Sequence, residues 1–272
     1  HTSVLRFLEA RFGVKETNIS AFRRAVCGDL TSVFNFATPN TEVLPTLAGR
    51  TTKAAADTLR ASQDALTQVA LPGTATLPKQ AIGTRPSRAL PYELHTSARC
   101  DAASGKVQLL FANTGKQAAV FHVYDKLHLD RLPRRYMVEA GKTLDDTWAA
   151  MTDDAGLYDL WVLGPNGFHR HFKGDLNALR ANGVAQPEVR VCYDITNGNV
   201  YLTMMNTGTK AAGFTVKAKA YRGDGPWAAS VAGNTTVDQH WDLAASGQWY
   251  DFAVTCDTDP RYYRRFAGRV ET

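Results

Sequence analysis

The chain has 272 residues, of which 44% are hydrophobic and 21% are charged. This composition is ordinary for a globular protein, and it excludes wholesale disorder, a collagen-like repeat and a coiled-coil rod. No apolar run approaches the ~18 residues that a membrane-spanning helix needs. The net charge is only +5, so nucleic acid is not expected as a partner.

A short amphipathic helix is expected at the start of the chain. Leu5, Leu8 and Phe12 fall on one helical face, and Gly13 stands where a helix usually ends. An apolar stripe of this kind needs another apolar surface to pack against. We therefore interpret residues 1–36 as the tail of a larger domain that precedes them.

Residues 37–89 are rich in proline and poor in aromatic residues, which predicts a connector. One Ala-rich stretch, residues 51–70, is expected to be helical. Its apolar face is thin, being limited to Leu59, Leu66 and Val69, so this helix is expected to lie on a surface.

From about residue 90 onward, short β-rich runs occur in a pattern that repeats. Val107 begins a run that ends at Asn113-Thr-Gly, and Val200 begins a run that ends at Asn206-Thr-Gly, 93 residues later. We infer a tandem duplication, with copies at 90–180 and 181–272. Other matches keep the same spacing to within one residue: Cys100 with Cys192, Phe121 with Phe214, Trp148 with Trp241, Tyr158 with Tyr250, and Gly174 with Gly268.

A unit of about 90 residues built from short strands predicts a two-layer β-sandwich. The expected fold is mainly β, with two tandem immunoglobulin-like β-sandwiches after a helical and irregular N-terminal segment. Tyr158 and Tyr250 fit the corner before a central strand, where a tyrosine hydroxyl bonds to upstream backbone. We interpret them as structural residues; an aromatic ligand platform is the functional alternative.

The four cysteines include no C-x-x-C pair, which disfavours a zinc or thioredoxin-like site. Cys100 and Cys192 are explained as one buried apolar residue in each copy. Cys192 and Cys256 would form a disulfide inside the second copy if the protein is exported. The sequence is consistent with both alternatives, this disulfide and free thiols.

The strand region contains none of the sequence patterns G-x-S-x-G, H-E-x-x-H or P-loop. His169 and His171 lie on one strand face and would supply half of a metal site. No third ligand is evident, so surface strand positions explain them more simply. Asp145-Asp146 and Asp153-Asp154 are explained as turn and cap residues rather than calcium ligands. We therefore predict no metal or cofactor site in this chain.

His1 is the best candidate for chemistry. The opening His1-Thr-Ser places an imidazole and two hydroxyls at a helix N-terminus, where anions bind well, although an ordinary cap explains the same residues. This opening, which runs to Glu9, and the segment from Arg23 to Phe36 resemble the end of the catalytic domain of phosphocholine-preferring bacterial phospholipases C. The run Arg88-Ala-Leu-Pro-Tyr-Glu-Leu and both repeats resemble the duplicated C-terminal domain of the same family.

The resemblance implies a parent enzyme that is exported, hence secreted or periplasmic, and that cleaves phosphatidylcholine or sphingomyelin to release phosphocholine. It also implies that the hydroxyl nucleophile and the ligands of any divalent metal lie upstream. This chain alone is therefore expected to be inactive. Of the matching positions, only His1 falls near that active site, and it is carried over as the catalytic candidate.

Two functions are consistent with these residues. In the first, the chain is the non-catalytic C-terminal region of such an enzyme, and the sandwiches brace the catalytic domain or position it at a phospholipid surface. In the second, the sandwiches are an independent carbohydrate- or surface-binding module whose tryptophans stack on sugars. Residues 1–36 favour the first function, because an independent module has no use for the tail of another domain. Trp148 and Trp241 are expected in the core.

Binding to an anionic lipid surface would require two arginine clusters to share one face. The alternative is that both clusters are solvated and point in different directions, and we favour it. The clusters are Arg131, Arg134 and Arg135, and Arg261, Arg264 and Arg265.

Overall fold

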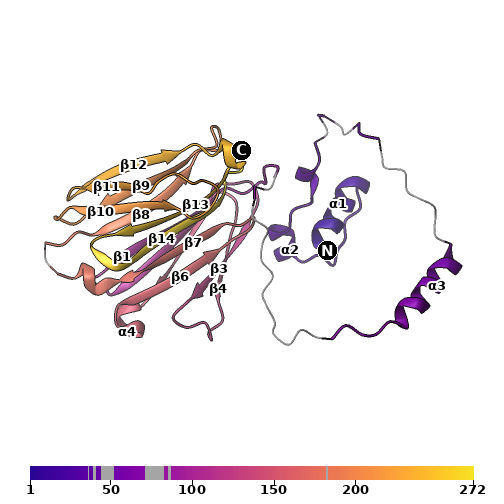
Figure 1. Cartoon of the computed structure of the whole chain (residues 1–272), viewed down its shortest axis with the longest axis horizontal. Coiled ribbons are helices and arrows are strands. Elements are labelled where there is room, and N and C mark those ends of the chain that lie inside the picture. Colours follow the sequence, from indigo (N-terminus) through magenta and orange to yellow (C-terminus); the bar gives the residue numbers. More distant parts are fainter. Residues whose placement is uncertain (36, 39–40, 44–51, 71–82, 85–86, 182) are drawn as a thin grey trace. The chain divides into compact units, whose positions relative to one another are not determined.

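The computed structural model divides the chain into two units, His1–Phe34 with Gly83–Thr272, and Asn35–Ile82 (Figure 1). The structure describes residues 1–35, 37–38, 41–43, 52–70, 83–84, 87–181 and 183–272. The helices are α1 (Thr2–Phe12), α2 (Ala21–Val26), α3 (Lys53–Asp64), α4 (Ala150–Asp154) and the 3-10 turns η1 (Thr31–Val33), η2 (Leu176–Leu179) and η3 (Ala244–Ser246).

The helices of the first 34 residues begin and end as local sequence dictates. α1 ends at Gly13, whose φ of 70° is a conformation that residues with a Cβ rarely adopt. α2 begins after Ser20, whose hydroxyl accepts a hydrogen bond from the backbone N–H of Arg23. Both helices are short, so their stability depends on packing.

The second unit contains α3, which lies inside the stretch expected to be helical. Thr52 caps it by accepting a hydrogen bond from the backbone N–H of Ala55, and every side chain of α3 is exposed. Other parts of the expected connector, residues 39–40, 44–51, 71–82 and 85–86, lie outside the described residues.

The strands form two sets of seven, one in each copy of the repeat. The first set is β1 (Leu94–Asp101), β2 (Lys106–Asn113), β3 (Ala119–Asp125), β4 (Arg134–Val138), β5 (Lys142–Trp148), β6 (Leu157–Leu163) and β7 (His169–Asp175). The second set is β8 (Pro187–Tyr193), β9 (Val200–Asn206), β10 (Ala212–Ala218), β11 (Trp227–Val231), β12 (Thr235–Trp241), β13 (Trp249–Cys256) and β14 (Asp259–Arg269).

The two sets have the same strand order, which is that of an immunoglobulin-like sandwich. In each copy the first, second and fifth strands form a three-stranded antiparallel sheet. The other four strands form the opposing layer, in the order β4-β3-β6-β7 in the first copy and β11-β10-β13-β14 in the second. The expectation of a mainly β fold is confirmed.

The last strands of the two copies, β7 and β14, pair with each other and join the copies into one eight-stranded sheet (Figure 1). In this pairing Arg170 lies opposite Phe266, and Phe172 lies opposite Arg264. All four side chains are buried, and they point into the core shared by the two copies. Trp148 and Trp241 are also buried, as expected.

The strand register corrects one match between the copies. Cys100 pairs with Val107 in the β1–β2 ladder, whereas Tyr193 pairs with Val200 in the β8–β9 ladder. Because Val107 and Val200 are equivalent, Tyr193 is the counterpart of Cys100. Cys192 is one position away, so its side chain points to solvent instead of the core.

All four cysteines lie among the described residues, and each is a free thiol. Cys192 is exposed on β8, whereas Cys256 is buried at the end of β13 in the opposing sheet. The disulfide that was left open between them is therefore not formed in this structure. Within the described ranges, no helix is long and apolar enough to cross a membrane.

Candidate functional site

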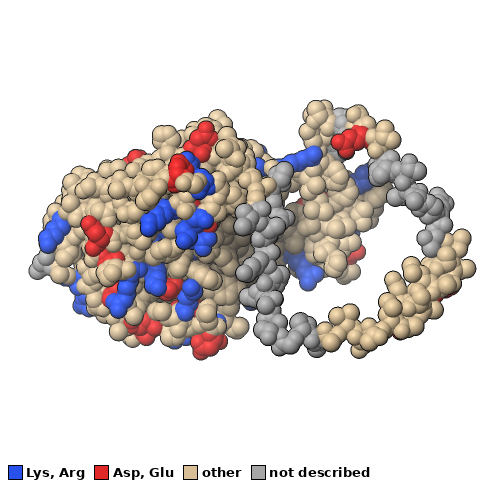
Figure 2. Space-filling model, in the orientation of Figure 1, with Lys and Arg blue, Asp and Glu red and all other residues tan. Residues whose placement is uncertain are grey.

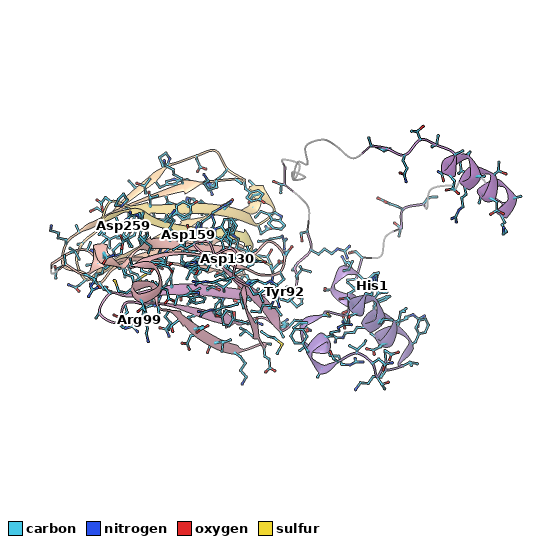
Figure 3. The ribbon with its side chains drawn as sticks, turned by 90° about the horizontal axis from the view of Figure 1, so that it is seen from below. His1, Tyr92, Arg99, Asp130, Asp159 and Asp259 are labelled. Carbon is cyan, nitrogen blue, oxygen red and sulfur yellow. The ribbon has the colours of Figure 1, made fainter. Side chains whose placement is uncertain are left out.

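His1 lies at the N-cap of α1 (Figure 3). Its backbone carbonyl accepts hydrogen bonds from the N–H groups of Val4 and Leu5, while its exposed side chain makes no capping bond within the described helix. The one group of metal-ligating side chains found among the described residues does not include His1. The catalytic role carried over to His1 remains a prediction.

A bidentate ion pair ties α1 to α2. The Arg24 guanidinium donates from both terminal nitrogens to the Glu9 carboxylate, at 2.9 and 2.8 Å. Glu9 also accepts a hydrogen bond from the Glu16 N–H at 2.6 Å. The Arg24 contact lowers the pKa of Glu9 to about 2, although partial desolvation opposes the shift. The two helices are thus fixed to each other by charge, without a core of their own.

The apolar side chains of residues 1–34 remain largely uncovered. Ile19 is the one large aliphatic residue of this described segment that is buried. A segment of this size cannot bury enough apolar surface to hold itself together. The exposed apolar residues include Val4, Leu5, Leu8, Phe12, Val14, Phe22, Leu30 and Val33.

The corner tyrosines use their hydroxyls differently from the expected pattern. The Tyr158 hydroxyl accepts a hydrogen bond from Nη2 of Arg264 at 2.9 Å, and the Tyr250 hydroxyl accepts one from Nη2 of Arg170 at 2.8 Å. Tyr158 belongs to the first copy and Arg264 to the second, while Tyr250 and Arg170 reverse this order. The prediction that these hydroxyls bond to upstream backbone is wrong, because the pairing of β7 with β14 brings a buried guanidinium to each of them.

The two arginine–tyrosine pairs have different counter-charges. Nε and Nη2 of Arg264 donate to the Glu188 carboxylate at 2.7 and 2.9 Å. The β1 and β8 registers place His95 at the position equivalent to Glu188. Arg170 is fully buried, and its Nε has no hydrogen-bond partner among the described residues. Its guanidinium lies 4.1 Å from the centre of the Phe168 ring, a cation–π contact that partly offsets the missing carboxylate.

His169 and His171 are not simple surface residues. His171 is buried, and its Nε2 lies 2.6 Å from Oδ1 of Asp159. Burial lowers the pKa of His169 to about 4, and the charge of Arg265 adds to this effect. The expectation of a surface position is wrong for His171, because β14 pairs with β7 and covers it, whereas His169 on the same strand is half-buried. Asp159, the partner of His171, is labelled in Figure 3.

A group of metal-ligating residues that sequence inspection missed lies in the first copy. Asp125 ends β3, His128 follows in the β3–β4 connection, and Asp154 ends α4. One ligand atom from each residue lies within 4.8 Å of the other two. His128 had not been singled out, and Asp154 had been assigned to a cap, because 26 residues separate them in sequence.

The arginine clusters are largely neutralised by carboxylates. Arg264 is buried against Glu188, whereas its neighbour Arg265 points to the opposite sheet face and pairs with Asp251. The two clusters therefore do not present six free charges on one face. Figure 2 shows acidic and basic side chains interspersed on the visible face of the strands. The other ion pairs of the clusters are Arg131 with Asp125, Arg134 with Asp146, and Arg261 with Asp175.

The tryptophans are mostly engaged in packing. The ring centroids of Trp227 and Trp241 lie 5.1 Å apart, and the Trp148 ring is covered by the Arg134 guanidinium at 4.4 Å. Lys126 lies 4.0 Å from the centre of the Trp161 ring. These contacts occupy faces that a sugar ring would need, so they do not favour the carbohydrate-binding module.

Comparisons with known proteins agree with the duplicated β architecture. The family described as "Bacterial phospholipase C, C-terminal domain" matches residues 86–175 and 187–269, which contain the strands of both copies. The chain is 46% identical over 272 residues to the "Non-hemolytic phospholipase C" of Pseudomonas aeruginosa, and 43% identical over 278 residues to the protein of the same name in Burkholderia pseudomallei. It is 39% identical over 302 residues to the "Hemolytic phospholipase C" of Pseudomonas aeruginosa.

These alignments cover 100% of this chain but 39%, 38% and 40% of the three relatives. The chain thus spans about two fifths of their length. The family match covers more than half of the chain and both sandwiches. The chain therefore belongs to the bacterial phospholipase C C-terminal domain family.

Proposed function

We propose that this chain is part of a larger, exported bacterial phospholipase C that releases phosphocholine from phosphatidylcholine or sphingomyelin. In this proposal residues 1–34 complete the fold of the catalytic domain. The two sandwiches act together as a brace that holds that domain. The nucleophile and any metal ligands lie in the remainder of the enzyme, and the phospholipase names of the relatives support this activity.

The observation that carries the proposal is the uncovered apolar face of α1. Leu5, Leu8 and Phe12 are exposed although they are spaced to face one side of the helix. Burying each such side chain contributes about 1.5–3 kcal/mol, so the contact between α1 and a partner surface would be considerably stabilising. A catalytic domain in the same polypeptide is the partner that the resemblance of this segment favours.

The bracing role is supported by the junction between the copies. The β7–β14 pairing and the reciprocal arginine–tyrosine bonds leave no hinge between the sandwiches in the described residues 187–269 and 94–175. Two sandwiches joined in this way are expected to move as one rigid body instead of bending relative to each other. Because most of the clustered arginines already have carboxylate partners, bracing is favoured over attachment to an anionic membrane.

The first test measures activity of the purified 272-residue chain with a phosphocholine ester and divalent metal ions. The expected result is no turnover above a buffer blank. Turnover that is abolished by His1→Ala would contradict the placement of the nucleophile outside this chain.

The second test uses the longer enzyme that carries this chain. Leu5→Asp combined with Leu8→Asp is expected to lower both the melting temperature and the phospholipase activity, because a charge is placed in a buried contact. Leu59→Asp is the matched control, since Leu59 is an exposed leucine on α3. If the α1 double variant behaves like the Leu59→Asp control, residues 1–34 do not pack on the catalytic domain.

A further inference from the structure

Asp125, His128 and Asp154 form a compact group that neither the phospholipase activity nor the junction between the copies explains. His128 Nε2 lies 2.5 Å from Oδ1 of Asp154. Asp125 offers a second carboxylate close to both, within the 4.8 Å that encloses the three ligand atoms. The three residues come from two connections on one end of the first sandwich, so tertiary folding brings them together.

We propose that Asp125, His128 and Asp154 bind one transition-metal ion of the Zn²⁺ type. One imidazole nitrogen and two carboxylate oxygens are a donor set that Zn²⁺ accepts, with water in the remaining position. The ion would be held by a neutral imidazole and ionised carboxylates, the forms in which these side chains act as metal ligands. This site goes beyond the proposed phospholipase function and does not depend on it.

The three side chains of the group are only partly exposed to solvent. The side chains of Asp125, His128 and Asp154 are 16%, 26% and 17% exposed, so solvent screens them only partly. Asp125 and Asp154 also line a cavity of about 60 Å³, together with Asp153, Arg131 and Arg134, and His128 lies outside that lining. The volume is enough for an ion and a bound water.

Two arginines line the same cavity: Arg134 is paired with Asp146, and Arg131 is the one that contacts Asp125. Its Nη1 lies 3.8 Å from Oδ2 of Asp125, and its side chain is 55% exposed. A contact of this length to an exposed guanidinium contributes little. A divalent ion bound directly between two carboxylates is expected to displace the Arg131 guanidinium into solvent.

The second copy shows that the fold itself does not need these residues. Ala218 ends β10 as Asp125 ends β3, and the two residues pair with Phe252 and Leu160 at equivalent positions of the next strand. Counting back four residues from Tyr158 gives Asp154, and counting back from Tyr250 gives Ser246. A site that served only to close the sandwich would be expected in both copies, whereas a metal site is needed only once.

The experiment is a calorimetric titration of the full 272-residue chain, stripped with a chelator, with ZnCl₂ and separately with MnCl₂ and CaCl₂. A Cys192→Ser background removes the exposed thiol as a competing ligand. One Zn²⁺ site is expected, with Zn²⁺ bound more tightly than Mn²⁺ or Ca²⁺. His128→Gln and Asp125→Asn should each weaken Zn²⁺ binding by more than about tenfold.

His122→Gln is the matched control, because His122 lies on the same strand as Asp125 but outside the group. Arg131→Gln should tighten Zn²⁺ binding, a result that a purely structural ion pair would not produce. The proposal is overturned if Zn²⁺ does not bind with 1:1 stoichiometry, or if His128→Gln binds Zn²⁺ as tightly as the control. If the His128 variant unfolds, the X-ray absorption spectrum of the Zn²⁺-loaded parent decides: one imidazole with oxygen ligands supports the site, and any other ligand set rejects it.

Discussion

The Arg264 guanidinium of the second copy donates a hydrogen bond to the Tyr158 hydroxyl of the first copy, at 2.9 Å in a fully buried environment. Glu188 neutralises Arg264 from the other side. Arg170 and Tyr250 repeat the relationship with the copies exchanged. Each sandwich therefore completes the polar core of its neighbour, which explains why the copies share one core instead of forming two separate ones.

Removing the tyrosine hydroxyls should have unequal effects. Tyr158→Phe is expected to lower the free energy of unfolding by about 1.5–3 kcal/mol, the usual range for a bond to a charged group. Tyr250→Phe should cost more, because Arg170 lacks the carboxylate that Glu188 supplies to Arg264. Urea unfolding followed by fluorescence measures both variants. Equal losses, or a larger loss in Tyr158→Phe, would show that the missing counter-charge does not matter.

Gly174 should not tolerate a side chain. A Cβ at this position would lie 2.5 Å from the Tyr158 hydroxyl, whereas a Cβ at Gly28 has nothing within 4 Å. Gly174→Ala is therefore expected to destabilise the protein by about 1–3 kcal/mol, because it displaces the tyrosine from Arg264. Gly28→Ala is the control and should unfold at nearly the same urea concentration as the parent. If Gly174→Ala leaves the free energy of unfolding unchanged, Tyr158 can move aside without loss of stability.

Acid should destabilise the protein through two half-buried histidines. Burial lowers the pKa of both His95 and His169 to about 4, from an ordinary value of 6.5. Since the folded state prefers the neutral imidazoles, stability is complete above pH 6.5 and is lost as the pH falls from 6.5 toward 4. Each histidine contributes a slope of up to about 1.4 kcal/mol per pH unit, before solvent screening reduces it.

His169→Gln removes one of these titrations and provides the test. Its urea unfolding curves, measured at several values between pH 7.5 and 4.5, should show a shallower loss of stability than the parent. The comparison at pH 7.5 gives the packing cost of the substitution separately. Parallel pH profiles for the two proteins would contradict the lowered pKa of His169.

The link between α1 and α2 should respond to a different pH range. Because Arg24 lowers the pKa of Glu9 to about 2, the ion pair is present above pH 4.5 and is lost only as the pH falls through about 2. Glu9→Gln is expected to speed amide hydrogen exchange in α2 at pH 7, since one charged partner of Arg24 is gone. Lys15→Gln, an exposed charge between the helices, is the control. Unchanged exchange in Glu9→Gln would mean that other contacts hold α2.

Local signals in the sequence were sufficient for the fold class and for the helix at the start of the chain. Alternation of apolar and polar residues, interrupted by turns such as Asn113-Thr-Gly, predicts strands because side chains alternate between two sheet faces. Gly13 marks the end of α1 because a glycine adopts the left-handed conformation found there without the steric cost of a Cβ. The repeat spacing likewise predicts that the two copies share a strand order.

The strand register within each repeat was harder to predict from the sequence. Matching cysteines by their type paired Cys100 with Cys192, but the ladders place Tyr193 opposite the equivalent valine. A shift of one residue turns a strand side chain from the core to solvent, so a one-residue error in the alignment reverses the expected burial.

What the chain determines by itself is therefore local: the strands, the turns, the first helix and the duplication that relates the two sets. The polar pairs were decided by tertiary structure. Arg264 meets Tyr158 across 106 residues, and His128 meets Asp154 across 26. No alternation of apolar and polar residues predicts such contacts, because they depend on which edge strands pair and on how the connections fold at the ends of the sandwich. Pairing of β7 with β14 buries arginines that the sequence alone presents as ordinary surface charges.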